Sequence, residues 1–127
     1  MPRVVHFEIS ADDPERAVKF YTNVFGWTIN KWKGPMDYWL LTTGKDEPGI
    51  NGAIMKREQP LTGKDGMIGY TCTMDVDNVD NYIKKVEKNG GKVIQPKGAI
   101  PGVGWFAMCL DTEGNVFGLM REDPSAE

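Results

Sequence analysis

An internal repeat constrains the fold of this chain more than any other feature of its sequence. Residues 6–29, HFEISADDPERAVKFYTNVFGWTI, align without a gap to residues 71–94, TCTMDVDNVDNYIKKVEKNGGKVI. Few residues are identical. Each copy nevertheless begins with an alternating, strand-like pattern, passes an Asp-containing helix start and continues with apolar residues at helical spacing. The sequence therefore predicts two copies of one small structural unit.

The helix of each copy is indicated by its apolar spacing and by the residues at its ends. The apolar positions are Ala17, Phe20, Tyr21 and Val24 in the first copy, and Val79, Tyr82, Ile83 and Val86 in the second. Residues that favour a helix N-cap precede both helices. The first has Asp13, followed by Pro14 at the first helical position, and the second has Asp77 or Asn78. Both helices are expected to end at a glycine, Gly26 in the first and Gly91 in the second, with Gly90 as a further cap candidate.

Three strand-like segments follow each helix, separated by turns rich in Pro and Gly. They cover residues 27–33, 38–43 and 50–56 in the first half and residues 92–96, 105–110 and 115–121 in the second. The chain is thus predicted to be a single α+β domain, residues 1–127, made of βαβββ units at 1–56 and 67–122 with a polar linker at 57–66. One unit alone would leave a sheet face bare. We therefore expect the two units to form a cupped mixed sheet with the helices outside.

Composition and charge exclude several classes of partner. No run approaches the roughly 20 apolar residues of a membrane span. The start, MPRVVHFEIS, lacks the zones of a secretory signal, so a cytoplasmic location is expected. The net charge is −3 and the lysines are interleaved with acids, which argues against nucleic acid as a partner. Cys72 and Cys109 lie in apolar runs and are expected to be buried thiols rather than a disulfide.

Four phrases of the sequence together carry a family resemblance. HFEISADDPERAVKFYTNVFGW, GINGAIM, VDNVDNYIKKVEKNGGKVI and DTEGNVFGLM, in this order and spacing, resemble the vicinal-oxygen-chelate superfamily of glyoxalases, bleomycin-resistance proteins and extradiol dioxygenases. The resemblance covers nearly the whole chain and implies the doubled βαβββ fold. It names no reaction, because this superfamily includes isomerases, dioxygenases, epimerases, fosfomycin-modifying enzymes and non-catalytic drug-binding proteins.

The resemblance also implies a divalent metal held by up to four residues, one each from the first and last strands of both units. Carried onto this sequence, those positions are His6, Gly52, Thr71 and Gly118. Among them only His6 is a good metal ligand. Gly52 and Gly118 are expected at equivalent positions of the two units, where the lack of a side chain would widen the cup rather than hold an ion. We therefore expect no cofactor, with His6 as the only retained candidate for metal binding.

Glu8 provides the alternative to a metal-free protein. It follows His6 by two residues, so both side chains point to one sheet face roughly 7 Å apart. A metal site of His6, Glu8 and an acid of the second half, such as Asp75, is the alternative, although two ligands at this spacing are hard to aim at one ion without a bulge. Glu8 is also the candidate general base.

These positions lead to a predicted small-molecule site and to two competing functions. The residues expected to bind the ligand, with the two tryptophans as aromatic walls, are His6, Glu8, Trp39, Thr71, Thr73 and Trp105. The favoured function is a protein that binds a small molecule in this aromatic cup without the family's full metal site. The alternative is a metal-dependent lyase, isomerase or dioxygenase that uses His6 and Glu8. A homodimer is expected, because the sheet edges carry unpaired backbone groups.

Overall fold

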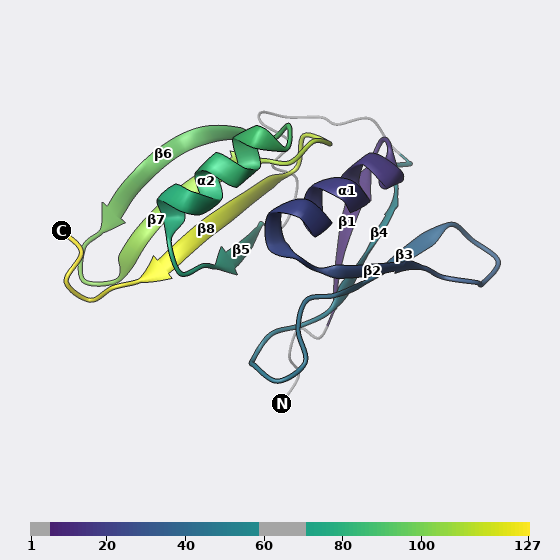
Figure 1. Cartoon of the computed structure of the whole chain (residues 1–127), viewed down its shortest axis with the longest axis horizontal. Helices are drawn as coiled ribbons and strands as arrows, with labels where there is room; N and C mark the ends of the chain where they lie inside the picture. Colours follow the sequence, from purple (N-terminus) through teal and green to yellow (C-terminus); the bar gives the residue numbers. More distant parts are fainter. Residues whose placement is uncertain (1–5, 59–70) are drawn as a thin grey trace. The chain divides into compact units, whose positions relative to one another are not determined.

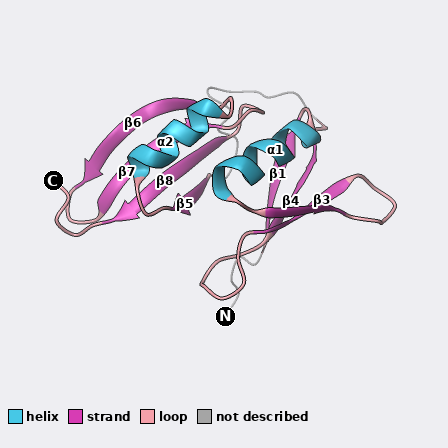
Figure 2. Cartoon of the chain, viewed as in Figure 1, coloured by secondary structure: helices cyan, strands magenta, loops and turns pink. Residues whose placement is uncertain are grey.

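Each half of the chain forms the predicted βαβββ unit. The computed structural model describes residues 6–58 and 71–127, and in these residues there are eight strands and two helices (Figure 1). The first unit consists of β1 (Phe7–Ala11), α1 (Pro14–Phe25), β2 (Thr28–Lys31), β3 (Tyr38–Thr42) and β4 (Gly52–Lys56). The second consists of β5 (Cys72–Asp75), α2 (Val79–Lys88), β6 (Lys92–Ile100), β7 (Gly104–Leu110) and β8 (Val116–Glu122). One helix accompanies four strands in each unit (Figure 2).

The two units share one strand order. In the first the order is β1-β4-β3-β2, and in the second it is β5-β8-β7-β6. The first and last strands of each unit pair in parallel, and all other pairs are antiparallel. The α+β class and the doubled unit are therefore confirmed. The chain divides into compact units at Met1–Pro60 and Leu61–Glu127, and most of the predicted linker, 57–66, lies outside the described residues.

The helix N-caps agree with the sequence. The side chain of Asp13 accepts a hydrogen bond from the backbone N–H of Arg16 at 3.2 Å. Asn78, rather than Asp77, caps α2 by accepting from the N–H of Asn81 at 3.0 Å. Each contact satisfies one of the amide groups that the first turn of a helix leaves unpaired.

The C-terminal ends of the two helices differ by one position. Gly26 follows α1 directly in the left-handed conformation, with φ at 71°. In the second unit the left-handed residue is Gly90, with φ at 92°, and Gly91 donates its N–H to the carbonyl of Val86 at 2.8 Å. The cap candidate Gly90 therefore holds the left-handed position, and the predicted equivalence of Gly26 with Gly91 is one residue out. Glycine suits this conformation because it has no Cβ.

Each helix packs on one face of its own sheet. The buried residues of α1 are the predicted Ala17, Phe20, Tyr21 and Val24. The ring of Tyr21 stacks on Trp27 with centroids 5.2 Å apart, and Phe7 meets the same indole edge-on at 6.0 Å. In the second unit the fully buried residues are Val79 and Val86 of α2, Ala107 and Cys109 of β7, and Phe117 and Leu119 of β8. These clusters form the apolar cores of the units.

The two cysteines differ in environment. Both are free thiols, and Cys109 is buried as predicted, whereas Cys72 is exposed. Burial raises the pKa of the Cys109 thiol to about 11, with a smaller contribution from the charge of Glu87, so this thiol is neutral at physiological pH.

Candidate functional site

In the first unit α1 packs on one face of the sheet, and the strand register determines which residues lie on the other face. Glu8 pairs with Ala53, and Ala53 pairs with Leu40. Tyr38, two residues from Leu40, shares its face. His6, which precedes β1, lies on this face because its ring meets the hydroxyl of Tyr38. We call these residues, His6, Glu8, Tyr38, Leu40 and Ala53, the open face of the first unit.

A chain of hydrogen bonds joins three side chains of this open face. The hydroxyl of Tyr38 donates to Oε2 of Glu8 at 2.6 Å. The phenolic proton is thus used in the bond to the carboxylate, so the oxygen of Tyr38 can only accept from His6. Nε2 of His6, 3.0 Å from this oxygen, must therefore carry a proton and donate it. The chain therefore runs from His6 through Tyr38 to Glu8, and its second bond is short because the acceptor is ionised.

A small residue on β4 allows this contact. In the sheet β4 separates β1 from β3, so β1 and β3 lie roughly 10 Å apart. On the open face β4 presents Met55, which pairs with Tyr38, and Ala53, which is fully buried and lies between Glu8 and Leu40. The methyl group leaves room for the Tyr38 side chain to cross β4 and reach β1.

Glu8 strengthens the hold of Tyr38 on its phenolic proton. The hydrogen bond to Glu8, with additional effects of burial and of the carboxylate charge, raises the pKa of Tyr38 from 10.0 to about 12. At physiological pH the phenol is therefore a hydrogen-bond donor aimed at the carboxylate. Neither Oε1 of Glu8 nor Nδ1 of His6 has a partner among the described residues, so both can accept hydrogen bonds from a ligand.

Replacing Glu8 by glutamine is expected to lower the pKa of Tyr38 from about 12 toward 10.0. A neutral amide accepts the phenolic proton less strongly and carries no charge. The raised pKa stabilises the folded protein below pH 10.0, and this contribution is lost as the pH rises through about 12. A pH titration of the ring-carbon NMR resonances of Tyr38 measures the shift, with Glu15→Gln as a charge-matched control. Equal Tyr38 pKa values in wild type and Glu8→Gln would show that the bond is absent.

The sequence-predicted aromatic walls lie on the wrong face. Trp39 pairs with Ile54 of β4 and shares the face of the buried Leu41, which packs toward α1. Trp105 pairs with Arg121, and its indole N–H donates to Asp123 at 3.1 Å. Both tryptophans therefore lie on the sheet faces turned toward the helices, one residue away from a position on the open faces. The open faces instead carry their chain neighbours, Tyr38 and Phe106, and the ring of Trp32 meets that of Tyr38 edge-on at 6.2 Å.

The second unit also has an open face, on the side of its sheet opposite α2. Thr73 pairs with Gly118 and Gly118 with Met108, while Asp75 pairs with Met120 and Met120 with Phe106. A Cβ at residue 118 would lie 2.8 Å from the ring of Phe106 and 2.9 Å from the hydroxyl of Thr73. Both side chains therefore fill the space that a larger residue would need. Thr71, just before β5, is exposed.

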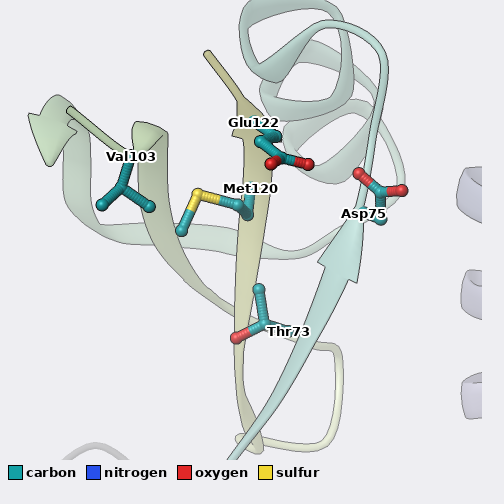
Figure 3. Close-up of a pocket in the computed structure, with 5 residues that line it drawn as sticks. All are labelled: Thr73, Asp75, Val103, Met120 and Glu122. Carbon is teal, nitrogen blue, oxygen red and sulfur yellow. The ribbon is translucent and has the colours of Figure 1, made fainter. Parts of the chain in front are cut away.

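A hollow of ≈ 330 Å³ opens on this face. Its lining residues are Thr73 and Asp75 of β5, Met120 and Glu122 of β8, and Val103 of the loop between β6 and β7 (Figure 3). Of the residues that sequence analysis assigned to a ligand, only Thr73 lies here. Asp75 was considered only as a metal ligand. The sequence analysis missed the other three lining residues, Val103, Met120 and Glu122. The position of Val103 depends on the conformation of a loop, and the face on which Met120 and Glu122 lie depends on the register of β8.

The residues present do not fit the metal site that the resemblance implies. Gly52 pairs with Phe7, and a Cβ there would collide with the Phe7 carbonyl and ring, so residue 52 points toward α1. The open-face residue of β4 is Ala53, which pairs with Glu8 as Gly118 pairs with Thr73. The predicted equivalence of Gly52 with Gly118 is therefore wrong by one residue.

The donor groups lead to the same result. Neither Ala53 nor Gly118 carries a metal-binding atom, and the imidazole of His6 and the carboxylate of Glu8 both bond to Tyr38. Across residues 6–58 and 71–127, His, Cys, Asp and Glu side chains form no group of three suited to a metal ion. We derive no chemistry through a metal.

Comparison with known proteins decides the family. Residues 3–119 match the family described as the Glyoxalase/Bleomycin resistance protein/Dioxygenase superfamily. The chain belongs to this superfamily. It is 33% identical over 115 residues to a glyoxylase-like domain-containing protein of Didymella fabae, and the match covers 88% of each. It is 30% identical over 119 residues to CFP32 of Mycobacterium tuberculosis, covering 92% of this chain but only 43% of that protein.

Solved structures of the glyoxalase superfamily agree with the fold. A glyoxalase/bleomycin resistance protein/dioxygenase family enzyme from Burkholderia phytofirmans has a TM-score of 0.76 at 22% identity, over 93% of this chain and 97% of that one. At this identity the likeness concerns the fold alone. Among the helices described for this superfamily member, none has the length and apolar character needed to cross a membrane.

Proposed function

We propose that this protein binds an organic small molecule on its open sheet faces, without a metal ion between protein and ligand. The observation that supports this most directly is the engagement of His6 and Glu8 with Tyr38. His6 is the retained candidate for metal binding and Glu8 its alternative partner, but both side chains bond to a neutral phenol. Ala53, which pairs with Glu8, and Gly118, which pairs with Thr73, offer no side-chain donor.

The polar atoms left over on the open face of the first unit define what it can recognise. Oε1 of Glu8 and Nδ1 of His6 are acceptors, and Leu40 on the same face is 43% exposed and so offers an apolar surface. A ligand with N–H or O–H groups and an apolar surface complements this arrangement. Few polar groups beside an apolar surface are the usual composition of a small-molecule site.

A binding screen tests the proposal. Amines, alcohols and carboxylic acids with apolar bodies are titrated into the protein, once with EDTA and once with Ni²⁺ or Zn²⁺, and followed by NMR. Compounds that shift the resonances of His6, Glu8 and Tyr38 should bind equally well in both conditions. Glu8→Gln should weaken them about tenfold or more, and Glu15→Gln should not. Binding that requires added metal would contradict the proposal.

Two further features belong to the proposal. The edge strands of the described sheets, β1 and β2 in one and β5 and β6 in the other, offer unpaired backbone groups that a second copy would cover, so the homodimer stays a prediction. A cytoplasmic location is likewise proposed from the sequence.

A further inference from the structure

The hollow in the second unit combines negative charge with an apolar wall. Asp75 lies opposite Met120 in the parallel pair of β5 and β8, and Glu122 follows Met120 by two residues on the same face. Figure 3 shows the carboxylates of Asp75 and Glu122 turned toward each other and Met120 extending toward Val103. The lining therefore has an acidic side and an apolar side.

The two carboxylates have no partner in the described part of the chain. No side-chain hydrogen bond or ion pair joins the carboxylate of Asp75 or Glu122 to any residue at 6–58 or 71–127. Two cations in the described part of this unit lie elsewhere: Lys97 bonds to Asp80 at 2.7 Å, and Arg121 alternates with Glu122 onto the opposite sheet face. Two neighbouring like charges that have no counter-charge among the described residues favour a cation between them.

The apolar side of the hollow is exposed yet held in place. Val103 is 48% exposed, although valine usually lies inside. Its carbonyl accepts the N–H of Asp123 at 2.9 Å, and its own N–H donates to Ile100 at 2.9 Å. Both backbone groups are thus fixed while the side chain faces solvent. The thioether of Met120 is polarisable and adapts to irregular apolar partners.

We propose that this hollow binds an organic cation with an apolar body, the ammonium or amidinium group between Asp75 and Glu122 and the body against Met120 and Val103. The inference rests on the proposed small-molecule function and names a ligand class for the second unit. The hydroxyl of Thr73, on the same wall, can accept a further hydrogen bond from the cationic group.

Three probes that share one apolar body and differ in charge test this inference: adamantylammonium, adamantanol and adamantane carboxylate. Each is titrated into the full chain at low salt, where exposed charges are least screened, and followed by amide NMR. The ammonium should shift the resonances of Asp75, Val103 and Glu122 and bind at least about tenfold more tightly than the alcohol. The carboxylate should not shift them.

The double variant Asp75→Asn/Glu122→Gln should reduce the affinity for the ammonium to that for the alcohol. Both side chains are exposed and the amides have the same shape, so the fold should persist, and the two single variants should each show part of the loss. The double variant Glu15→Gln/Glu87→Gln changes the net charge equally, at exposed helix positions, and should bind as wild type does.

Three outcomes would overturn the inference: equal affinity for ammonium and alcohol, an equal loss in both double variants, or no shift at the hollow residues with any probe. The proposed function is tested separately through Glu8 of the first unit. If compounds bind at Glu8 but adamantylammonium does not shift the hollow residues, only the cation site is refuted and the proposed function stands.

Discussion

Replacing Leu41 by alanine is expected to lower the free energy of unfolding by about 2–5 kcal/mol, whereas the same change at Leu40 should alter it by less than about 0.5 kcal/mol. The two leucines are consecutive in β3 and differ only in the face they occupy. Leu41 is 2% exposed and packs toward α1, and Leu40 is 43% exposed on the open face. Deleting a buried leucine removes its contacts and leaves a cavity. At an exposed position water fills the space.

Urea denaturation of the two variants measures the difference, and equal slopes would show that the compactness of the unfolded state is unchanged. Comparable losses at Leu40 and Leu41, or a larger loss at Leu40, would mean that β3 is one residue out of register. In that case Tyr38 would point toward α1 and the open face would lose its phenol. The pair is thus a direct check on the geometry of the site.

The helices and the doubled unit followed from local patterns in the sequence. Apolar residues at helical spacing placed Ala17, Phe20, Tyr21 and Val24 under α1, where all four are buried. Asp13 and Asn78 cap the helices because a short polar side chain before the first turn has one favoured bond to make. The repeat predicted two equivalent units, and the two sheets share one strand order.

The facing of individual strand residues was harder to predict. In β3 the run YWLLT is almost wholly apolar, so no alternation distinguishes Tyr38 from Trp39, and the larger ring was assigned to the site. In β4 the residues GAIM gave the same ambiguity, and Gly52 was chosen where Ala53 faces the site. Both errors are shifts of one residue, and in a strand one residue reverses the face.

The bond between Tyr38 and Glu8 depends on contacts across the sheet. The two residues are 30 positions apart in the chain and on strands that are not neighbours. His6 was predicted from the family resemblance and Glu8 from its parity with His6, and the structure brings them together through Tyr38. No local pattern could have indicated that a third residue joins them.

The second large effect concerns metal retention. A functional site of this family's metal-dependent type would hold about one divalent ion per chain through purification, because several ligands act together. We expect this protein to retain far less than that and to show no glyoxalase activity when metal is added. Its open-face positions offer His6 and Glu8, both bonded to Tyr38, beside Ala53 and Gly118.

Elemental analysis after incubation with Ni²⁺, Zn²⁺, Mn²⁺ or Fe²⁺ and desalting tests the proposed metal-independent function most directly. The expected result is a metal content well below stoichiometric that does not change in His6→Ala. The contradicting result is about one ion per chain that is lost in both His6→Ala and Glu8→Gln. That outcome would establish a metal-dependent site on the first unit and replace metal-free binding with the enzyme alternative.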